Sequence, residues 1–428
     1  MTTDLRVLLD GEQVGIVSQT PGGAAQFEYD NAYREGRLAT PLSLSMPLVR
    51  SRHKNRAVRA YLQGLLPDSP GRIDQLAREH QVSPRNPVAL LAHVGRDAPG
   101  AVQLVPGDEA SSELSTHDDA TELDDTELDE LVADLVAHAD TWGRRAGDVR
   151  WSLPGAQPKV ALYRTDAGRW AVPRGMTPST HILKPAVAPY VDHHLNELVT
   201  MSAARGLGLD VAECEALTTV HGHHVFAARR YDRRREGSRT QRLHQEDLCQ
   251  ALSVAPSVKY QADGGPGIRQ IGALFASLPD PDDRRGNARR FFDAIVFSVA
   301  VMGTDAHAKN YSVMLEGDRA TLAPLYDLGS YAPYARDGRT PARLAMSVAG
   351  EFRVDAVSTA MLVDAARSLG LDQEWARARV TDITGGVVDA VDTAAADARQ
   401  KLGDHPFLSA YVDSVATHAR ARGWIAAQ

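Results

Sequence analysis

The stretch GTDAHAKNYSVML, residues 303–315, places an Asp, a His, a Lys and an Asn within six positions, directly after an apolar run. That run, residues 291–302, contains Asp293 and Ser298 and is too short to span a bilayer, so it predicts a buried helix. The sequence pattern of residues 311–315 indicates a strand. A polar loop in this place is either part of an active site or a capped turn.

The spacing within the loop matches one used for phosphate transfer. Asp305 and Asn310 form the pattern D-x-x-x-x-N, with which protein kinases place a carboxylate at the acceptor hydroxyl and an amide on a metal ion. Transfer from ATP also needs further oxygen ligands for Mg²⁺, a cation on the phosphates and a loop over them. The spacing alone is a weak signal, because it occurs by chance in many proteins.

A second carboxylate strengthens the interpretation. The predicted strand is followed by another at residues 320–325, and this hairpin leads to APLYDLGS, residues 323–330. There Asp327 begins Asp-Leu-Gly, which corresponds to the Asp-Phe-Gly segment that holds the metal in kinases. The coupled motifs favour Asp305 as the catalytic residue and Asn310 and Asp327 as metal ligands. The alternative is that the two aspartates only cap turns.

Upstream segments supply candidates for the rest of the site. HILK ends in Lys184, which is either the strand lysine that neutralises phosphate charge or an ordinary strand-end lysine. Glu197, on the following predicted helix, could pair with it. No G-x-G-x-x-G exists, so WSLPGAQPKVAL, residues 151–162, is the candidate phosphate loop, with a plain hairpin loop as the alternative.

Two basic segments admit more than one interpretation. AARRYDRR, residues 227–234, is either a hinge whose backbone binds adenine or a solvated basic cluster. HGHH, residues 221–224, has no Cys or third spaced ligand nearby, which favours a turn with exposed histidines over a metal site.

Composition limits the class of protein. The chain has 428 residues, of which 43% are hydrophobic and 24% charged, as in an ordinary soluble protein of two or three structural units. A net charge of −8 gives no global signal for binding nucleic acid or an anionic membrane. The two cysteines, Cys214 and Cys249, exclude a disulfide framework, and the N-terminus lacks the features of a signal peptide. We therefore expect a cytoplasmic protein.

Patterning divides the chain into four expected segments. Residues 1–107 predict a mixed α/β subdomain, with a hairpin at LRVLLDGEQVGIV and helices on either side of Pro67. Residues 108–149 form an acidic linker and a helix, residues 150–245 a kinase-like N-lobe with short strands, and residues 246–428 a helical C-lobe with the catalytic and metal loops.

These segments together resemble the HipA family of serine/threonine kinases, the toxins of bacterial HipBA toxin–antitoxin modules. The resemblance covers nearly the whole chain. It is carried, in order, by PLSLSMPL (41–48), LLPDSPGR (65–72), VGRDAPGAVQL (94–104), SLPGAQPK, THILK, RRYDRR, HQEDLCQ, PSVKYQADGGPGI, TDAHAKN and YDLGS. It implies an α+β fold, in which an N-terminal α/β subdomain accompanies a two-lobed protein-kinase-like core with an all-helical C-terminal lobe.

The resemblance also assigns roles to residues. It implies that Asp305 is catalytic, that Asn310 and Asp327 bind Mg²⁺, and that Lys184 binds ATP phosphate. The remaining implied nucleotide contacts come from the phosphate loop, the hinge and the catalytic loop: Pro154, Gly155, Ala156, Gln157, Pro158, Lys159, Arg229, Arg230, Tyr231, His307, Ala308, Lys309 and Asn310. Ser152 matches an autophosphorylated serine, where added charge would disfavour the ATP-bound loop.

Partners follow from the same resemblance. It implies phosphorylation of an aminoacyl-tRNA synthetase, neutralisation by a small helix-turn-helix antitoxin of HipB type, and contact with operator DNA mainly through that antitoxin. Residues 347–370 contain only Arg353 and Arg367 as basic residues, which agrees with little direct DNA contact. The alternatives are an antitoxin-bound co-repressor whose catalysis is secondary, and a small-molecule kinase.

Overall fold

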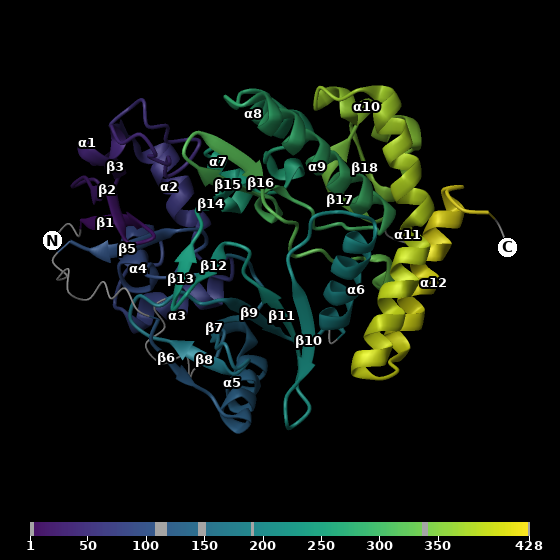
Figure 1. The fold of residues 1–428 in the computed structure, drawn as a ribbon, viewed down its shortest axis with the longest axis horizontal. Coiled ribbons are helices and arrows are strands. Elements are labelled where there is room, and N and C mark those ends of the chain that lie inside the picture. The colour runs from purple at the N-terminus through teal and green to yellow at the C-terminus, as the bar shows by residue number, and fades with distance from the viewer. Residues whose placement is uncertain (1–3, 108–117, 144–150, 190–191, 336–340, 427–428) are drawn as a thin grey trace. The chain divides into compact units, whose positions relative to one another are not determined.

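The computed structural model describes residues 4–107, 118–143, 151–189, 192–335 and 341–426 (Figure 1). The chain forms two compact units. Unit 1 comprises Met1–Val187, Thr218–Ser257 and Ser312–Ala320, and unit 2 comprises Ala188–Leu217, Val258–Tyr311 and Thr321–Gln428. Each unit is thus assembled from segments that are distant in sequence. Part of the predicted acidic linker, residues 108–117, lies outside the described residues.

Unit 1 begins with an antiparallel five-stranded sheet of order β4-β3-β2-β1-β5. Its strands are β1 (Leu5–Leu9), β2 (Glu12–Gln19), β3 (Ala25–Tyr29), β4 (Arg52–His53) and β5 (Val102–Pro106). The hairpin predicted around the Asp-Gly pair is confirmed as β1–β2. Asp10 has φ 48° and Gly11 φ 89°, as a two-residue turn that follows strand twist requires.

Four helices accompany this sheet. They are α1 (Asn31–Arg34), α2 (Asn55–Gly64), α3 (Pro70–Glu79) and α4 (Pro87–Val94). The predicted break at Pro67 is confirmed, because α2 ends before it and α3 begins after Ser69, whose hydroxyl accepts a hydrogen bond from the Arg72 N–H at 3.3 Å. Apolar side chains of the sheet and helices, Phe27, Tyr61 and Leu91 among them, form one buried core.

Five strands of a second sheet lie in unit 1, where they are antiparallel and have the order β11-β9-β7-β8-β6. Its bounds are β6 (Ala120–Glu122), β7 (Val160–Arg164), β8 (Trp170–Pro173), β9 (His181–Pro185) and β11 (His224–Arg229). The preceding helix α5 (Asp125–Ala137) buries Leu128, Val132 and Leu135, which recur at helical spacing. Strand β9 pairs with both β7 and β11, and Lys184 lies near the end of β9, opposite Phe226 on β11.

Unit 1 is completed by short elements. The hairpin of β12 (Arg233–Glu236) and β13 (Arg239–Arg242) is followed by β14 (Gln245–Asp247) and α7 (Leu248–Ala251). Strand β14 pairs with β15 (Ser312–Glu316), which returns from far along the chain. The boundary between the units falls within β10 (Cys214–Thr218) and within β16 (Arg319–Leu322).

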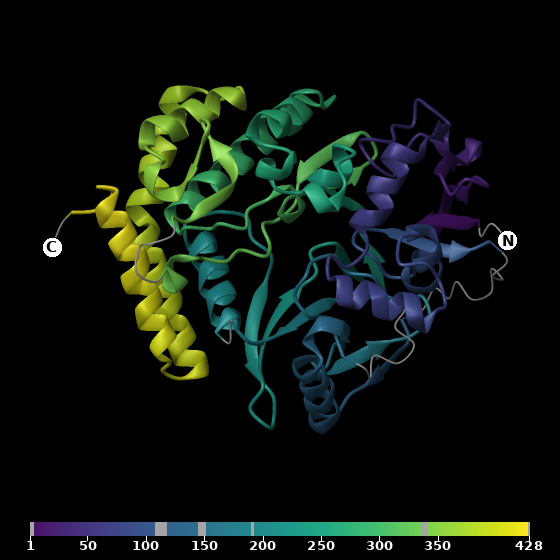
Figure 2. The same ribbon diagram turned by 180° about the vertical axis from the view of Figure 1, so that it is seen from behind.

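Unit 2 is mainly helical. Its helices are α6 (His193–Gly206), α8 (Ile268–Ala276), α9 (Pro281–Ala300), α10 (Thr359–Ser368), α11 (Gln373–Leu402) and α12 (Pro406–Ala421). Helices α11 and α12 lie side by side in both views (Figure 2). The unit also contains a hairpin, β17 (Arg343–Val348) and β18 (Glu351–Arg353), which the sequence pattern did not indicate. None of the described helices is long and apolar enough to cross a membrane.

A buried carboxyl group in unit 1 links stability to pH. Glu246, on β14, is 1% exposed, and its Oε1 accepts a hydrogen bond from the Leu44 N–H at 2.7 Å. Burial raises the pKa of Glu246 to about 8, although the hydrogen bonds from Ser43 and Leu44 oppose the rise. The folded chain therefore keeps a proton that the unfolded chain releases at an ordinary carboxyl pKa.

We expect Glu246→Gln to remove this pH dependence. In the wild type, the free energy of unfolding falls as the pH rises from the ordinary carboxyl value to about 8, by at most roughly 1.4 kcal/mol per pH unit for one proton. Urea unfolding midpoints at several pH values in that range measure the effect, with Glu12→Gln at an exposed position as the matched control. Parallel pH profiles for the wild type and Glu246→Gln would refute the assignment.

Candidate functional site

The loop that carries Asp305 is shaped by a tight turn after α9. The Gly303 N–H donates to the Ser298 carbonyl at 2.6 Å, and a Cβ on Gly303 would lie 3.3 Å from the Ser298 Cα. A larger residue would therefore push the turn away from the helix. Asp305 follows with its side chain 68% exposed. The turn thus presents this carboxylate at the surface of unit 2, just past the end of a buried helix.

Asn310 closes the loop on Asp305. The Asn310 Nδ2 donates to the Asp305 carbonyl oxygen at 2.8 Å, and the His307 N–H donates to the same oxygen at 2.8 Å. These bonds give the D-x-x-x-x-N spacing a structural reason, since the amide reaches back over the turn. The amide nitrogen is used within the loop, which leaves the Asn310 side-chain oxygen as the atom suited to a metal ion.

The Asp327 segment is anchored to the same loop. Asp327 adopts φ 57°, a left-handed conformation that is unusual for a non-glycine residue. The hydroxyl of the preceding Tyr326 donates to the Lys309 carbonyl at 2.9 Å. Asn196, on α6, donates to the Ser330 carbonyl at 2.7 Å and accepts from its N–H at 2.8 Å. The backbone on both sides of Asp327 is thereby fixed.

The three predicted catalytic and metal-binding residues border one small hollow of unit 2. Its volume is about 20 Å³, which is enough to hold one water molecule or one ion. The residues around it are Thr200, Phe297, Ser298, Val301, Gly303, Asp305, Ala306, Asn310, Tyr311, Asp327, Leu328 and Gly329. The structure therefore brings Asp305, Asn310 and Asp327 together, while their chemical roles stay predictions.

The other residues predicted from the catalytic loop are buried. His307 is 3% exposed, and its Nε2 lies 3.8 Å from the Asp305 carboxylate. Burial lowers the pKa of His307 against the opposing charge of Asp305, so the ring is neutral near pH 7. Ala308 is fully buried and Lys309 is 6% exposed. Glu197 is also buried, with its carboxylate 3.8 Å from the His193 Nε2.

The candidate autophosphorylation site lies in the interior of unit 1. Ser152 is 1% exposed. Its N–H donates to the Asp97 carbonyl at 2.9 Å, and its hydroxyl donates to the Leu65 carbonyl at 2.7 Å. The hydroxyl therefore points into the protein and has no room for a phosphate in this conformation.

The candidate phosphate loop that follows is a closed turn. The Gly155 carbonyl accepts from the Asp68 N–H at 2.9 Å, and the Lys159 Nζ donates to the Pro154 carbonyl at 2.7 Å. Gly155 has φ 103°, a backbone conformation that strains any residue with a Cβ. Ala156 is exposed, Gln157 is half-buried and Pro158 is buried. Lys184, on β9, is 7% exposed with its Nζ 5.4 Å from the Phe226 ring centroid.

The predicted hinge segment differs from one of its two interpretations. Arg229 is exposed, but Arg230 turns inward and its Nη2 lies 2.8 Å from Asp232. Arg233 is also buried, so the expectation of one solvated basic cluster is wrong for these two side chains. The Tyr231 hydroxyl donates to the Gln245 side chain. An adenine contact by the backbone of this segment stays a prediction.

Arg230 and Arg233 belong to a buried ion cluster centred on Asp97. The Asp97 carboxylate accepts from the Arg233 Nη2 at 2.7 Å and from the Ser179 N–H and hydroxyl at 2.9 and 2.6 Å. Burial alone would raise the pKa of Asp97. The guanidinium groups of Arg230, Arg233 and Arg242 outweigh it and hold that pKa well below its usual range. The cluster is therefore fully charged at neutral pH.

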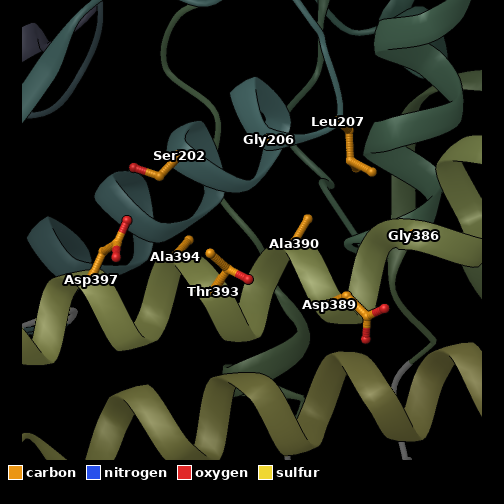
Figure 3. A pocket seen from close by; sticks show the side chains of 9 residues that line it. All are labelled: Ser202, Gly206, Leu207, Gly386, Asp389, Ala390, Thr393, Ala394 and Asp397. Carbon is orange, nitrogen blue, oxygen red and sulfur yellow. The ribbon is translucent and has the colours of Figure 1, made fainter.

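Two further features contain none of the predicted site residues. The turn at residues 221–224 holds no metal cluster among the described residues, and the His221 Nδ1 lies 2.7 Å from Asp129. A larger hollow of about 370 Å³ lies between α6 and α11, where no predicted site residue lines it (Figure 3). It is bordered by small and acidic side chains: Ser202, Gly206, Leu207, Gly386, Asp389, Ala390, Thr393, Ala394 and Asp397.

Sequence reasoning missed two residues that shape the site. Asn196 precedes Glu197 directly, but nothing in the sequence indicates that its partner is Ser330, on a distant segment. Tyr260 belongs to the segment PSVKYQADGGPGI, which carries the family resemblance but to which the sequence assigns no chemical role. In the structure its hydroxyl lies 2.6 Å from the Asp305 Oδ1.

Comparison with known proteins gives two family matches and several relatives. The family described as "HipA-like C-terminal domain" matches residues 151–391, and "HipA N-terminal domain" matches residues 5–105. The chain is 32% identical to "Putative kinase Y4mE" of Sinorhizobium fredii, over 97% of both chains. It is 28% identical to "Serine/threonine-protein kinase toxin HipA" of Shewanella oneidensis, covering 82% of this chain and 80% of that protein.

A solved structure shows the fold. HipA from the Shewanella oneidensis complex of HipA, HipB and operator DNA aligns with a TM-score of 0.81, at 23% identity, over 97% of this chain and 96% of that chain. The predicted α+β, kinase-like fold class is thereby confirmed.

The contribution of the buried ion cluster to the stability of unit 1 can be tested by mutation. We expect Asp97→Ala to lower the free energy of unfolding by about 3–5 kcal/mol, because it leaves buried arginines without their counter-charge. The matched control is Glu28→Ala, which removes an exposed pair with Arg52 at 2.8 Å and should cost about 0–1 kcal/mol. Urea unfolding compares the two variants. Equal losses would show that the cluster does not stabilise the fold.

Proposed function

The chain belongs to the HipA family, and from this premise we propose that it is an ATP-dependent serine/threonine protein kinase and the toxin of a toxin–antitoxin module. Its relatives are named as kinases, one of them as a serine/threonine-protein kinase toxin. The observation that carries the proposal is the hollow shared by Asp305, Asn310 and Asp327. A phosphoryl-transfer site needs a carboxylate for the acceptor beside oxygen ligands for a metal.

The side chains at the hollow suit Mg²⁺, and other segments supply the candidate contacts to ATP. Mg²⁺ prefers carboxylate and amide oxygens, which Asp327 and Asn310 supply. When bound, the ion would neutralise charge on the phosphates. We propose that Lys184 and residues 154–159 bind phosphate, and that the backbone of residues 229–231 binds adenine. Residues 307–310 would supply the remaining nucleotide contacts.

Asp305 would act on the acceptor. Its exposed carboxylate is free to accept a hydrogen bond from a serine or threonine hydroxyl, orient the oxygen towards the γ-phosphate and take its proton as the bond forms. The ring of His307, which lies in the same loop, is buried and neutral. The alternative roles of Asp305 and Asp327 as turn caps do not require both residues to border one hollow.

We further propose that Ser152 is autophosphorylated and that this controls the phosphate loop. Ser152 must first leave its bonds with Leu65 and Asp97, because the native hydroxyl is buried. A phosphate adds about −1.5 to −2 charge at pH 7, and this group could not return to a site beside the Asp97 carbonyl without a large desolvation penalty. Modification would therefore keep residues 152–159 out of the closed turn.

The proposed substrate and partners are those that the family resemblance implies. An aminoacyl-tRNA synthetase is the proposed substrate, which places the protein in the cytoplasm. A helix-turn-helix antitoxin is the proposed partner, and the matched solved structure is named as a complex with HipB and operator DNA. That name also favours the second candidate function, an antitoxin-bound co-repressor whose catalysis is secondary. Loss of growth arrest in a catalytically inactive variant would favour the kinase toxin.

Phosphate transfer tests the proposal directly. We expect the wild-type chain to transfer radiolabelled γ-phosphate from ATP and Mg²⁺ to itself and to a protein in a bacterial lysate, with phosphosite mapping to identify both acceptors. Asp305→Asn keeps the shape of the side chain but removes the charged acceptor, and should reduce labelling at least ~100-fold. The matched control, Asp318→Asn, changes an exposed aspartate and should label normally. Undiminished labelling by Asp305→Asn would contradict the mechanism.

A further inference from the structure

The hydroxyl of Tyr260 is aimed at the candidate catalytic carboxylate. It donates to the Asp305 Oδ1 at 2.6 Å, the short distance typical of a hydroxyl bound to a charged oxygen. The Tyr260 ring packs edge-on against His307, with 4.9 Å between ring centroids. The nearby His307 Nε2 is 3.8 Å from the same carboxylate, too far for a hydrogen bond. Among the described residues, Tyr260 is therefore the side chain that hydrogen-bonds this carboxylate.

Asp305 needs such a partner. Its side chain is 68% exposed, so neighbouring atoms restrict its rotation little. A carboxylate that is free to rotate spends part of its time facing away from the acceptor, and small misplacements of a reacting group cost large factors in rate. A hydrogen bond to one oxygen restricts the rotation of the carboxylate and leaves the other oxygen available to an acceptor.

Tyr260 is itself held rigidly. The Gly265 N–H donates to the Tyr260 carbonyl at 2.9 Å, and a Cβ on Gly265 would lie 2.2 Å from the Val258 carbonyl oxygen, so this turn admits only glycine. The next residue, Gln261, accepts from the Ser347 N–H at 2.8 Å and donates to its hydroxyl at 3.0 Å. The tyrosine hydroxyl is thus presented by a turn that is tied to strand β17.

We propose that Tyr260 is a positioning residue for phosphate transfer: its hydroxyl holds Asp305 Oδ1 so that Oδ2 receives the proton of the acceptor hydroxyl. The inference rests on the proposed kinase function and adds a residue outside the D-x-x-x-x-N and Asp-Leu-Gly motifs. Tyr260 does not contact the transferred phosphate in this role. Its effect passes through Asp305.

The same geometry would also arise if the Tyr260 hydroxyl were itself a phosphate acceptor, or if it blocked the approach of an acceptor to Asp305. A tyrosine hydroxyl on the catalytic carboxylate resembles an acceptor hydroxyl, and it would compete with one if both needed the same oxygen. The tie of Tyr260 to Gly265 and the anchoring of Gln261 on Ser347 argue against its moving toward a phosphate, because the turn would have to break. The two alternatives predict opposite outcomes from the positioning role.

Steady-state kinetics of the full chain test the proposal. Tyr260→Phe keeps the ring on His307 and removes only the hydroxyl. We expect kcat to fall about 10- to 100-fold while KM for ATP stays within about twofold, because the lost contact acts in the transition state and not in nucleotide binding. The matched control is Tyr33→Phe, which removes a hydroxyl bonded to Thr40 in unit 1 and should leave both constants unchanged.

Other results would overturn the inference. An unchanged kcat would show that the hydroxyl is dispensable, and a raised kcat would show that it blocks the acceptor. A lowered melting temperature with a raised KM and an unchanged kcat would assign Tyr260 a structural role. Phosphate mapped on Tyr260 in the wild type would make it a substrate. If Asp305→Asn loses transfer while Tyr260→Phe does not, this inference fails alone; if Asp305→Asn retains transfer, the proposed function fails.

Discussion

The buried carboxylate of Asp97 is the interaction on which the organisation of unit 1 depends. Its side chain binds Arg230, Arg233 and Ser179, and its carbonyl accepts from the Ser152 N–H. One residue therefore joins segments that are far apart in the chain. Three buried arginines face two buried aspartates in this cluster, and backbone carbonyls such as those of Ala98 and Gly100 accept further guanidinium N–H groups. Burying these charges is costly, so the cluster stabilises the fold only when it is complete.

Unit 2 depends on a different constraint, the closure of the loop that carries Asp305. Asn310 and His307 both donate to the Asp305 carbonyl, and the Tyr326 hydroxyl ties the segment of Asp327 to the Lys309 carbonyl. These bonds use backbone oxygens and the Asn310 amide nitrogen, not the side-chain oxygens to which we assign roles in the proposed function. Preorganisation of this kind is what phosphoryl transfer requires, because the protein contributes mainly position and charge to that reaction.

Sequence reasoning predicted the elements whose signal is local. The Asp-Gly pair indicated the β1–β2 hairpin, Ser69 and Pro70 indicated the start of α3, and the order of the motifs predicted that Asp305, Asn310 and Asp327 would meet. Apolar residues that recur every two or every 3.6 positions indicate a strand or a helix with one buried face. Such predictions therefore need no information about distant contacts.

Sequence reasoning failed where a residue far away in the chain determines whether a side chain is buried or which partner it binds. A run of arginines is typical of a solvated surface, but Arg233 is buried because Asp97, 136 positions earlier, supplies its counter-charge. The Tyr260–Asp305 bond spans 45 positions and the Asn196–Ser330 pair spans 134. No local pattern encodes these contacts. The hairpin β17–β18 was also missed among helices, although its two strands are adjacent in the chain.

The most direct test of the central claim is the position of a metal ion in crystals grown with Mn²⁺ and a non-hydrolysable ATP analogue. Anomalous scattering locates the metal independently of any assumption about the site. The account predicts a peak within coordination distance of the Asn310 side-chain oxygen and the Asp327 carboxylate, with the Asp305 carboxylate facing the terminal phosphate. A bound nucleotide whose metal lies away from Asn310 and Asp327 would contradict it.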